Sequence, residues 1–284
     1  MNGKGRALVG LIGANILKSL SPALHEDAFA AAGIRGYYHL MDLDQLPGRK
    51  LEQILAAVAT LGFAGVNVTF PVKQSVLPLL DEVSADARQI GAVNTVTFTR
   101  GGITTGYNTD RSGFRRSFEE GLGASAAAGR TVVLVGAGGA GRAVAFALMD
   151  LGVSTVAVHD TDTQKAAMLV ADLMTHYGAN HARLAESLPE TLAGAAGVVN
   201  ATPIGMLGIP GNPVPATALA AGHFVADVIY TPMETELIRS ARAKGCRVLT
   251  GGGMCVHQAA DAFRLFNGIE PDLVTIAKGL TSAS

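Results

Sequence analysis

One segment constrains the fold of this 284-residue chain most: an apolar strand that runs into a glycine-rich loop and then a helix. The apolar residues 132–135 precede a G-x-G-x-x-G pattern, and a helix-forming stretch follows it. The first glycine permits a tight turn, the second lets the backbone approach a pyrophosphate, and the third lets helix and strand pack closely. The helix N-terminus offers N–H groups and partial positive charge to phosphates. The candidate cofactor-binding residues of this loop are Gly136, Ala137, Gly138, Gly139 and Gly141.

The strand expected after this loop, residues 155–159, ends at Asp160. A carboxylate there would accept hydrogen bonds from the adenine ribose hydroxyls of a dinucleotide. Asp160 and Asp162 would repel a 2′-phosphate, and residues 159–165 contain no arginine to receive one. The sequence therefore predicts NAD, with NADP as the less favoured cofactor. The alternative is that Asp160 only caps the helix that follows.

Strand-like and helix-like segments alternate through the chain, which predicts an α/β fold with parallel sheets. Ser21 is the expected N-cap of the first helix, with Pro22 at its first position. Gly101 and Gly102 predict a hairpin, and the small-residue stretch 121–130 predicts a hinge. The expected strands are residues 8–12, 36–40, 65–69, 93–99, 103–107, 132–135, 155–159, 197–200, 224–229 and 247–249, and the helices named from sequence are 22–32, 51–61 and 254–266.

Composition excludes several classes of protein. The net charge is −1 without a basic block, so neither a nucleic acid nor an anionic membrane is an expected partner. Cys246 and Cys255 cannot build a disulfide framework, and the seven histidines show no zinc-ligand spacing, so no metal is expected. No run of 18 apolar residues exists. These features predict a cytoplasmic protein; the rival reading of residues 4–17 as a signal peptide is weakened by Gly10, Gly13 and Asn15.

The first half carries candidate chemistry around residues 65–73. In a strand, Asn67 and Thr69 would point to one face and the apolar residues between them to the other. Pro71 would then begin a helix with Lys73 in its first turn, where the helix dipole disfavours the charged amine. Such a lysine suits proton transfer. The plainer interpretation is a surface lysine.

Further polar residues stand where strands are expected to begin or end. Asn94 lies in Ala-Val-Asn-Thr, and Asp110 closes Asn-Thr-Asp before a helix. These side chains could converge with Lys73 on one cleft. Each also has a plainer role, since asparagine is common in turns and aspartate at N-caps.

Taken together, these stretches resemble the shikimate/quinate dehydrogenase family over nearly the full length of the chain. Their order and spacing are more specific than any one of them. Glu26 and the sequence His-Asp-Thr at 159–161 depart from patterns common in that family. The matching stretches are Ser-Leu-Ser-Pro-Ala-Leu-His (19–25), Asn-Val-Thr-Phe-Pro-Val-Lys (67–73), Gly-Ala-Val-Asn-Thr (91–95), Asn-Thr-Asp (108–110), the glycine loop, Asn-Ala-Thr-Pro (200–203) and Gln-Ala (258–259).

The resemblance implies a two-domain fold with the active site in the cleft between the domains. Residues 1–112, completed by 254–284, would form the substrate-binding and catalytic domain, and 113–253 the Rossmann domain. Ser19 and Ser21 would bind the substrate carboxylate, and Lys73 would be the acid/base with Asp110 beside it. The ring hydroxyls would be held by Asn67, Thr69, Asn94, Asp110 and Gln258. The nicotinamide would lie near Thr202, Val228, Tyr230 and Gly251.

The resemblance also implies a reaction: Lys73 takes the proton of the C3 hydroxyl as hydride leaves C3. Shikimate is the first expected substrate because Ser21 is the residue typical of shikimate users. Quinate, or both acids, is the alternative because NAD use is typical of the quinate branch. Either a biosynthetic role in the chorismate pathway of aromatic amino acids or a catabolic role fits, in a monomer or a homodimer. A non-catalytic ligand sensor is the rival of a different class; Lys73 and Asp110 argue against it.

Overall fold

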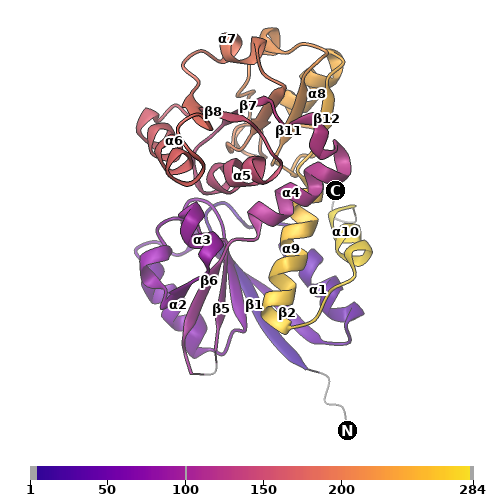
Figure 1. Ribbon diagram of the computed structural model, residues 1–284. Helices are drawn as coiled ribbons and strands as arrows, with labels where there is room; N and C mark the ends of the chain where they lie inside the picture. Colours follow the sequence, from indigo (N-terminus) through magenta and orange to yellow (C-terminus); the bar gives the residue numbers. More distant parts are fainter. Residues whose placement is uncertain (1–4, 100, 282–284) are drawn as a thin grey trace. The chain divides into compact units, whose positions relative to one another are not determined.

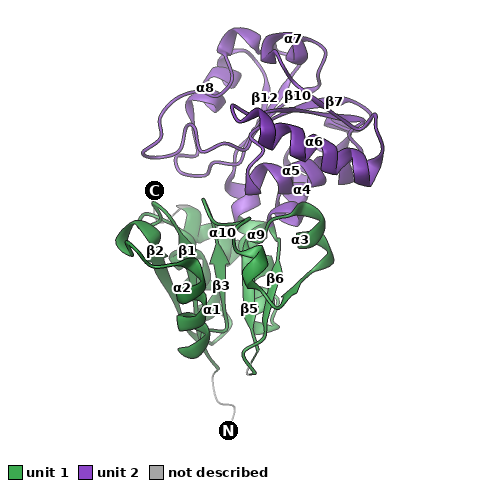
Figure 2. Cartoon of the chain, turned by 90° about the vertical axis from the view of Figure 1, so that its left-hand side faces the viewer, with its two compact units in different colours: residues 1–109, 256–284 green, residues 110–255 purple. Residues whose placement is uncertain are grey.

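The computed structural model describes residues 5–99 and 101–281. The chain forms two compact units (Figure 2). Unit 1 comprises residues 1–109 and 256–284, and unit 2 comprises residues 110–255. Each unit contains one β-sheet with helices packed on it (Figure 1). The α/β fold predicted from the alternation of segments is confirmed, with a mixed sheet in the N-terminal half and a parallel sheet in the C-terminal half.

The sheet of unit 1 has the strand order β2-β1-β3-β5-β6-β4 within the described residues. Strands β1 to β3 are parallel neighbours, whereas β5 runs antiparallel to both β3 and β6. The predicted hairpin is present as the β5–β6 pair, although its connection includes Arg100, which lies outside the described residues. The strands are β1 (Arg6–Gly13), β2 (Arg35–Asp42), β3 (Gly65–Val68), β4 (Glu82–Val83), β5 (Thr95–Phe98) and β6 (Thr104–Tyr107).

Helices cover both faces of this sheet. Val66 and Val68 of β3 pack with Leu55 and Val58 of helix α2. The other face of β3 meets helix α9, because a side chain on Gly65 would overlap the ring of Phe266. Asn67 alternates with Val66 and Val68, so it lies on the opposite face, as the sequence predicted, and this face is the one that meets α9. The helices of unit 1 are α1 (Ser21–Ala31), α2 (Leu51–Thr60), α3 (Ala85–Ile90), most of α9 (Gly252–Asn267) and α10 (Leu273–Thr281), with 3-10 turns η1 (Leu43–Gln45) and η2 (Leu77–Leu79).

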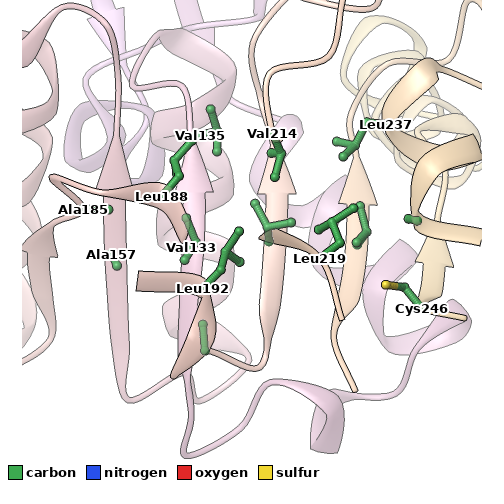
Figure 3. Close-up of a cluster of buried hydrophobic side chains, with 14 of the residues drawn as sticks. Val133, Val135, Ala157, Ala185, Leu188, Leu192, Val214, Leu219, Leu237 and Cys246 are labelled. Carbon is green, nitrogen blue, oxygen red and sulfur yellow. The ribbon is translucent and has the colours of Figure 1, made fainter. Parts of the chain in front are cut away.

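The sheet of unit 2 is parallel throughout, in the order β12-β11-β10-β7-β8-β9. Buried apolar side chains of this sheet form one cluster with those of α7 and α8, which includes Val133, Leu192 and Leu237 (Figure 3). Its strands are β7 (Thr131–Val135), β8 (Thr155–His159), β9 (Ala182–Leu184), β10 (Gly197–Asn200), β11 (Phe224–Asp227) and β12 (Arg247–Leu249), and its helices are α4 (Asp110–Gly121), η3 (Ala124–Ala126), α5 (Gly139–Asp150), α6 (Thr163–Tyr177), α7 (Leu188–Ala193), η4 (Ala216–Ala218) and α8 (Glu236–Ala243).

Two local predictions in unit 1 are wrong. Ser21 was expected to be the N-cap of the first helix, but it is the first residue of α1 and Leu20 is the N-cap. The N–H of Ser21 donates to the hydroxyl of Ser19. Lys73 lies in a turn and not in an α-helix. Its carbonyl accepts the N–H of Val93, at 2.8 Å, so it is not used for a helical bond to Leu77.

No helix within residues 5–99 and 101–281 is both long enough and apolar enough to cross a membrane. The apolar run that begins at Ala7 lies in β1, between β2 and β3.

Candidate active site

The glycine loop of unit 2 connects β7 to α5 as the sequence predicted. Gly136 has a φ of 103°, a left-handed conformation that favours glycine. Its N–H donates to the carbonyl of His159 at 2.8 Å, which ties the loop to the end of β8. Gly138 is the N-cap of α5, and no side chain of the cap residue accepts an N–H group of the first turn of this helix.

The glycines of this loop serve two different purposes. A Cβ on Gly141 would overlap the carbonyl oxygen of Gly136, so its role is close packing of helix and loop. A Cβ on Gly138 would meet no atom within 4 Å. Gly138 therefore faces open space at the positive end of α5, an environment that favours an anion. Both roles are those expected of a dinucleotide loop.

Asp160 follows β8 and lies against the glycine loop. Its Oδ2 accepts the N–H of Ala137 at 2.7 Å, and its Oδ1 accepts the N–H of Asp162 at 2.8 Å. The N-cap of α6 is Asp162, whose carboxylate accepts from Gln164 and Lys165. The alternative reading of Asp160 as the cap is therefore wrong. Hydrogen bonds from Lys165 and Gln164 also hold the pKa of Asp162 below its ordinary value.

A buried polar network joins the ends of β10 and β11. Asn200 accepts the N–H and hydroxyl of Thr202 and donates to Asp227 at 3.0 Å. Asp227 also accepts from the N–H of Ile229 at 3.1 Å and from the hydroxyl of Thr235 at 2.7 Å. Burial raises the pKa of Asp227 to about 6, even though all three hydrogen bonds favour the charged form.

This network fixes the backbone around the residues expected at the nicotinamide. Val228 directly follows Asp227 and Tyr230 comes two residues later, and both are half-buried. Gly251 packs on the same segment: its N–H donates to the Ile229 carbonyl at 3.2 Å, and a Cβ there would overlap the Val228 carbonyl. Thr202, Val228 and Gly251 thus lie around one group of strand ends. The sequence analysis placed Asn200 in a matching stretch without a role, and it did not single out Asp227 or Thr235, although Asn200 and Asp227 end buried strands.

In unit 1, Ser19 and Ser21 lie together where the loop after β1 enters α1. Their hydroxyl oxygens are 3.1 Å apart, with Ser19 as the donor. The same loop is tied to the end of β3, because Ala14 donates to the Phe70 carbonyl at 2.9 Å and Thr69 to the Ile12 carbonyl at 2.9 Å.

Asn67 is held by three neighbours. Its Oδ1 accepts the hydroxyl of Tyr38 at 2.9 Å, and its Nδ2 donates to Thr95 Oγ1 at 3.0 Å and to the Asn94 carbonyl at 3.3 Å. Both N–H groups of the amide are therefore used inside unit 1. The carbonyl oxygen keeps a second lone pair, which can accept a hydroxyl. Tyr38 was not predicted, and no motif in β2 marks it.

The side chain of Tyr38 is fixed in turn by an aromatic cluster. The ring of His25 stacks on it with centroids 4.7 Å apart, and Phe263 and Phe266 of α9 lie beyond. Burial lowers the pKa of His25 to about 3. A neutral imidazole in this cluster is therefore part of the support of Asn67.

Asn94 stands directly before β5 and fixes the start of the segment that contains Asp110. Its Oδ1 accepts the N–H of Thr109 at 2.8 Å, and its Nδ2 donates to the Thr109 hydroxyl at 2.9 Å. Asp110 is the next residue, buried at the beginning of α4.

The two remaining predicted residues, Lys73 and Gln258, lie in the turn after β3 and on α9. Lys73 is half-buried in the turn after β3, and its carbonyl is bonded to Val93, the neighbour of Asn94. Hydrogen bonds thus connect the segments of Asn67, Thr69, Lys73 and Asn94. Gln258 is half-buried on α9. No group of three His, Cys, Asp or Glu side chains that could hold a metal occurs in the described part of the chain.

Together, a parallel-sheet unit with a dinucleotide loop and a second unit with a serine pair and a lysine define a two-domain oxidoreductase. The family model for the shikimate dehydrogenase substrate-binding domain matches residues 11–96. Over its length the chain is similar to curated dehydrogenases, so it belongs to the shikimate/quinate dehydrogenase family.

Three relatives illustrate this similarity. A quinate/shikimate dehydrogenase (NAD(+)) of Corynebacterium efficiens is 48% identical over 94% of each chain. A shikimate dehydrogenase (NADP(+)) of Streptomyces avermitilis is 49% identical over 93% of this chain and 91% of its own. The structure of quinate dehydrogenase from Corynebacterium glutamicum in complex with NAD has a TM-score of 0.89 at 45% identity, covering 98% of this chain and all of that one.

Proposed function

We propose that the chain interconverts shikimate and 3-dehydroshikimate by hydride transfer at C3, with NAD as its cofactor. The observation that carries this proposal is the connected set of segments in unit 1 that presents Asn67, Thr69, Lys73 and Asn94. The similarity to dehydrogenases of both shikimate and quinate supports the reaction class. Quinate, oxidised to 3-dehydroquinate, is the second candidate because the relative with TM-score 0.89 is a quinate dehydrogenase.

The residues would divide the work as follows. The hydroxyls of Ser19 and Ser21 bind the substrate carboxylate next to the N-terminus of α1, whose partial positive charge favours an anion. The oxygen of Asn67, with Thr69, Asn94, Asp110 and Gln258, holds the ring hydroxyls in place.

The Nζ of Lys73, as a neutral amine, takes the proton of the C3 hydroxyl, and the C3 carbon becomes a ketone as its hydride departs. The nicotinamide, when bound, supplies the hydride acceptor. In the reverse direction the Lys73 ammonium returns the proton to the oxygen. Asp110 would orient the lysine and stabilise it in its charged form.

The preference for NAD is proposed from Asp160. Its carboxylate is held against the glycine loop by Ala137, where it would accept the ribose hydroxyls and repel a 2′-phosphate. The other cofactor-site residues are Gly136, Ala137, Gly138, Gly139, Gly141, Thr202, Val228, Tyr230 and Gly251.

A matrix of initial rates, shikimate and quinate against NAD and NADP, tests the proposal. We expect the highest kcat/KM for shikimate with NAD, and a preference for NAD of at least about tenfold, or roughly 1.4 kcal/mol. Replacing Asp160 with serine and Thr161 with arginine should move the preference toward NADP. Equal use of both cofactors would contradict the role of Asp160. Binding of both acids without turnover would favour a ligand sensor.

The functional division of the chain is also a proposal: 1–112 with 254–284 for substrate and catalysis, and 113–253 for the dinucleotide. We further propose a cytoplasmic enzyme that acts as a monomer or a homodimer.

A further inference from the structure

The loop that carries Ser19 is held by backbone hydrogen bonds at three consecutive residues. The N–H of Ala14 donates to the Phe70 carbonyl at 2.9 Å. The N–H of Asn15 donates to Oδ2 of Asp44, and that of Ile16 to Oδ2 of Asp42, each at 2.9 Å. Two of the three acceptors are carboxylates, which make stronger hydrogen bonds to N–H groups than neutral oxygens do.

Asp42 is placed to do this by the end of β2. It is 4% exposed, and it pairs in register with Gly13 at the end of β1. Its other oxygen, Oδ1, accepts the N–H of Asp44 at 3.0 Å, which caps the turn η1. One buried carboxylate therefore joins the loop after β1 to the loop after β2, and orients Asp44 toward Asn15.

The hydrogen bond from Ile16 to Asp42 lies one reverse turn before the serine pair, because Ile16 also bonds to Ser19. The carbonyl of Ile16 accepts the N–H of Ser19 at 2.8 Å, and the hydroxyl of Ser19 then bonds to Ser21. Asn15, between Ala14 and Ile16, has a φ of 55°, a left-handed conformation that asparagine adopts more readily than most residues. The loop thus makes a left-handed turn, and the two carboxylates hold it in place.

We propose that Asp42 is a positioning residue for substrate binding: through Ile16 it fixes the turn that presents the Ser19 hydroxyl to the substrate carboxylate. The inference rests on the proposed function, since it needs Ser19 to bind that carboxylate. Both carboxylate oxygens of Asp42 accept backbone N–H groups of this chain, so its effect on the substrate is indirect. Its contribution passes through Ser19, and this dependence is what an experiment can detect.

A double-mutant cycle of Asp42→Asn and Ser19→Ala tests the proposal. Asparagine has one acceptor oxygen and turns an NH₂ group toward the second N–H, so one of the two bonds is lost. In the parent, Asp42→Asn should raise the KM of shikimate or quinate about tenfold, with kcat within about twofold of the parent's. In the Ser19→Ala background, the same change should raise KM less than about twofold.

Two further measurements keep the test sharp. The Kd of NADH, from fluorescence titration, should be unchanged by Asp42→Asn. Asp27→Asn removes the same charge from an exposed site on α1 and should change nothing. If Asp42→Asn does not fold, Asp44→Ala removes only the exposed bond to Asn15. It should raise KM about threefold in the parent and not in the Ser19→Ala background.

The possible outcomes distinguish failure of the proposed function from failure of the proposed role of Asp42. A parent that turns over neither acid would overturn the proposed function and this inference with it. If the parent works normally, an equal increase in KM in both backgrounds, or no increase in either, would overturn this inference alone. A matching loss of NADH affinity would show a general structural role and would also overturn it.

Discussion

The candidate site in unit 2 is a glycine loop whose backbone lies next to open space, whereas the candidate site in unit 1 consists of polar side chains that hydrogen-bond to one another. At Gly138 a Cβ would meet only open space. The amides of Asn67 and Asn94 are held in orientation by hydrogen bonds with Tyr38, Thr95 and Thr109. A site made of backbone is built by local conformation, and a site made of side chains is built by long-range contacts. The two should therefore fail in different ways.

The largest effect is expected from a change at Lys73, which should lower turnover without weakening the binding of NADH. Lys73→Ala should lower turnover by a factor of about 10²–10⁴, the usual contribution of a general acid–base residue. The Kd of NADH should stay close to that of the parent. Lys73→Arg should not restore turnover, because arginine keeps its proton at any working pH. A folded Lys73→Ala protein with more than about a tenth of the parent rate would remove this lysine from the mechanism.

Acid should act on the two units with opposite sign. Native His25, with a pKa of about 3, binds a proton less tightly than the unfolded chain does at the ordinary 6.5. Its contribution to the stability of unit 1 is therefore lost as the pH falls below 6.5, by about 2 kcal/mol at pH 5. Native Asp227 binds its proton more tightly than at the ordinary 3.8, so below about pH 6 it adds stability to unit 2, about 1 kcal/mol at pH 5.

Native-state hydrogen exchange at pH 7 and pH 5, corrected for intrinsic rates, measures both contributions. His25→Phe keeps a ring against Tyr38 and should make unit 1 less sensitive to acid than the parent. Asp227→Asn should remove the gain in unit 2. If His25→Phe leaves the acid sensitivity of unit 1 as it is in the parent, the imidazole titrates in the native state and the burial argument fails.

Two glycines of one loop give the next contrast. Gly138→Ala places a methyl group in open space, so the melting temperature should hardly change while the Kd of NADH rises by about tenfold or more. Gly141→Ala places it on the Gly136 carbonyl, so the melting temperature itself should fall. Calorimetry with NADH titration of both variants checks this. Unchanged NADH affinity in Gly138→Ala would mean that the phosphates lie elsewhere.

The smallest effect concerns the choice of acid. Ser21→Thr adds one methyl group beside the Ser19 hydroxyl, and we expect kcat/KM to shift toward quinate over shikimate by about threefold to tenfold. The ratio of the two values, measured with NAD, checks this prediction. A ratio equal to the parent's would show that Ser21 does not select between the acids.

The difference between local conformation and long-range contacts also explains which elements could be predicted from the sequence. The strands at 197–200 and 247–249 were predicted to the residue. The first is fully buried, and a buried parallel strand is a short apolar run between turn residues. The glycine loop was equally clear, since its chemistry lies in consecutive residues. Strand β4, with two residues, is too short to show a period.

Other misses in unit 1, the turn at Lys73 and the residues that support the site, come from contacts between distant segments. Lys73 was expected in a helix, but its carbonyl bonds to Val93, and nothing near Lys73 in the sequence indicates this. The supports of the site, Tyr38 and Asp42, come from β2, about 25 to 30 residues from the groups they hold. Local propensity cannot reveal such pairs, because tertiary contacts decide them.

In the proposed division of roles, unit 1 binds the acid and unit 2 binds the dinucleotide. Hydrogen exchange of the parent with each ligand alone tests it directly. NADH should slow exchange at residues 136–141, and shikimate or quinate should slow exchange at 19–21 and 67–73. Protection of 136–141 by the acid alone, or of 19–21 by NADH alone, would contradict the claim.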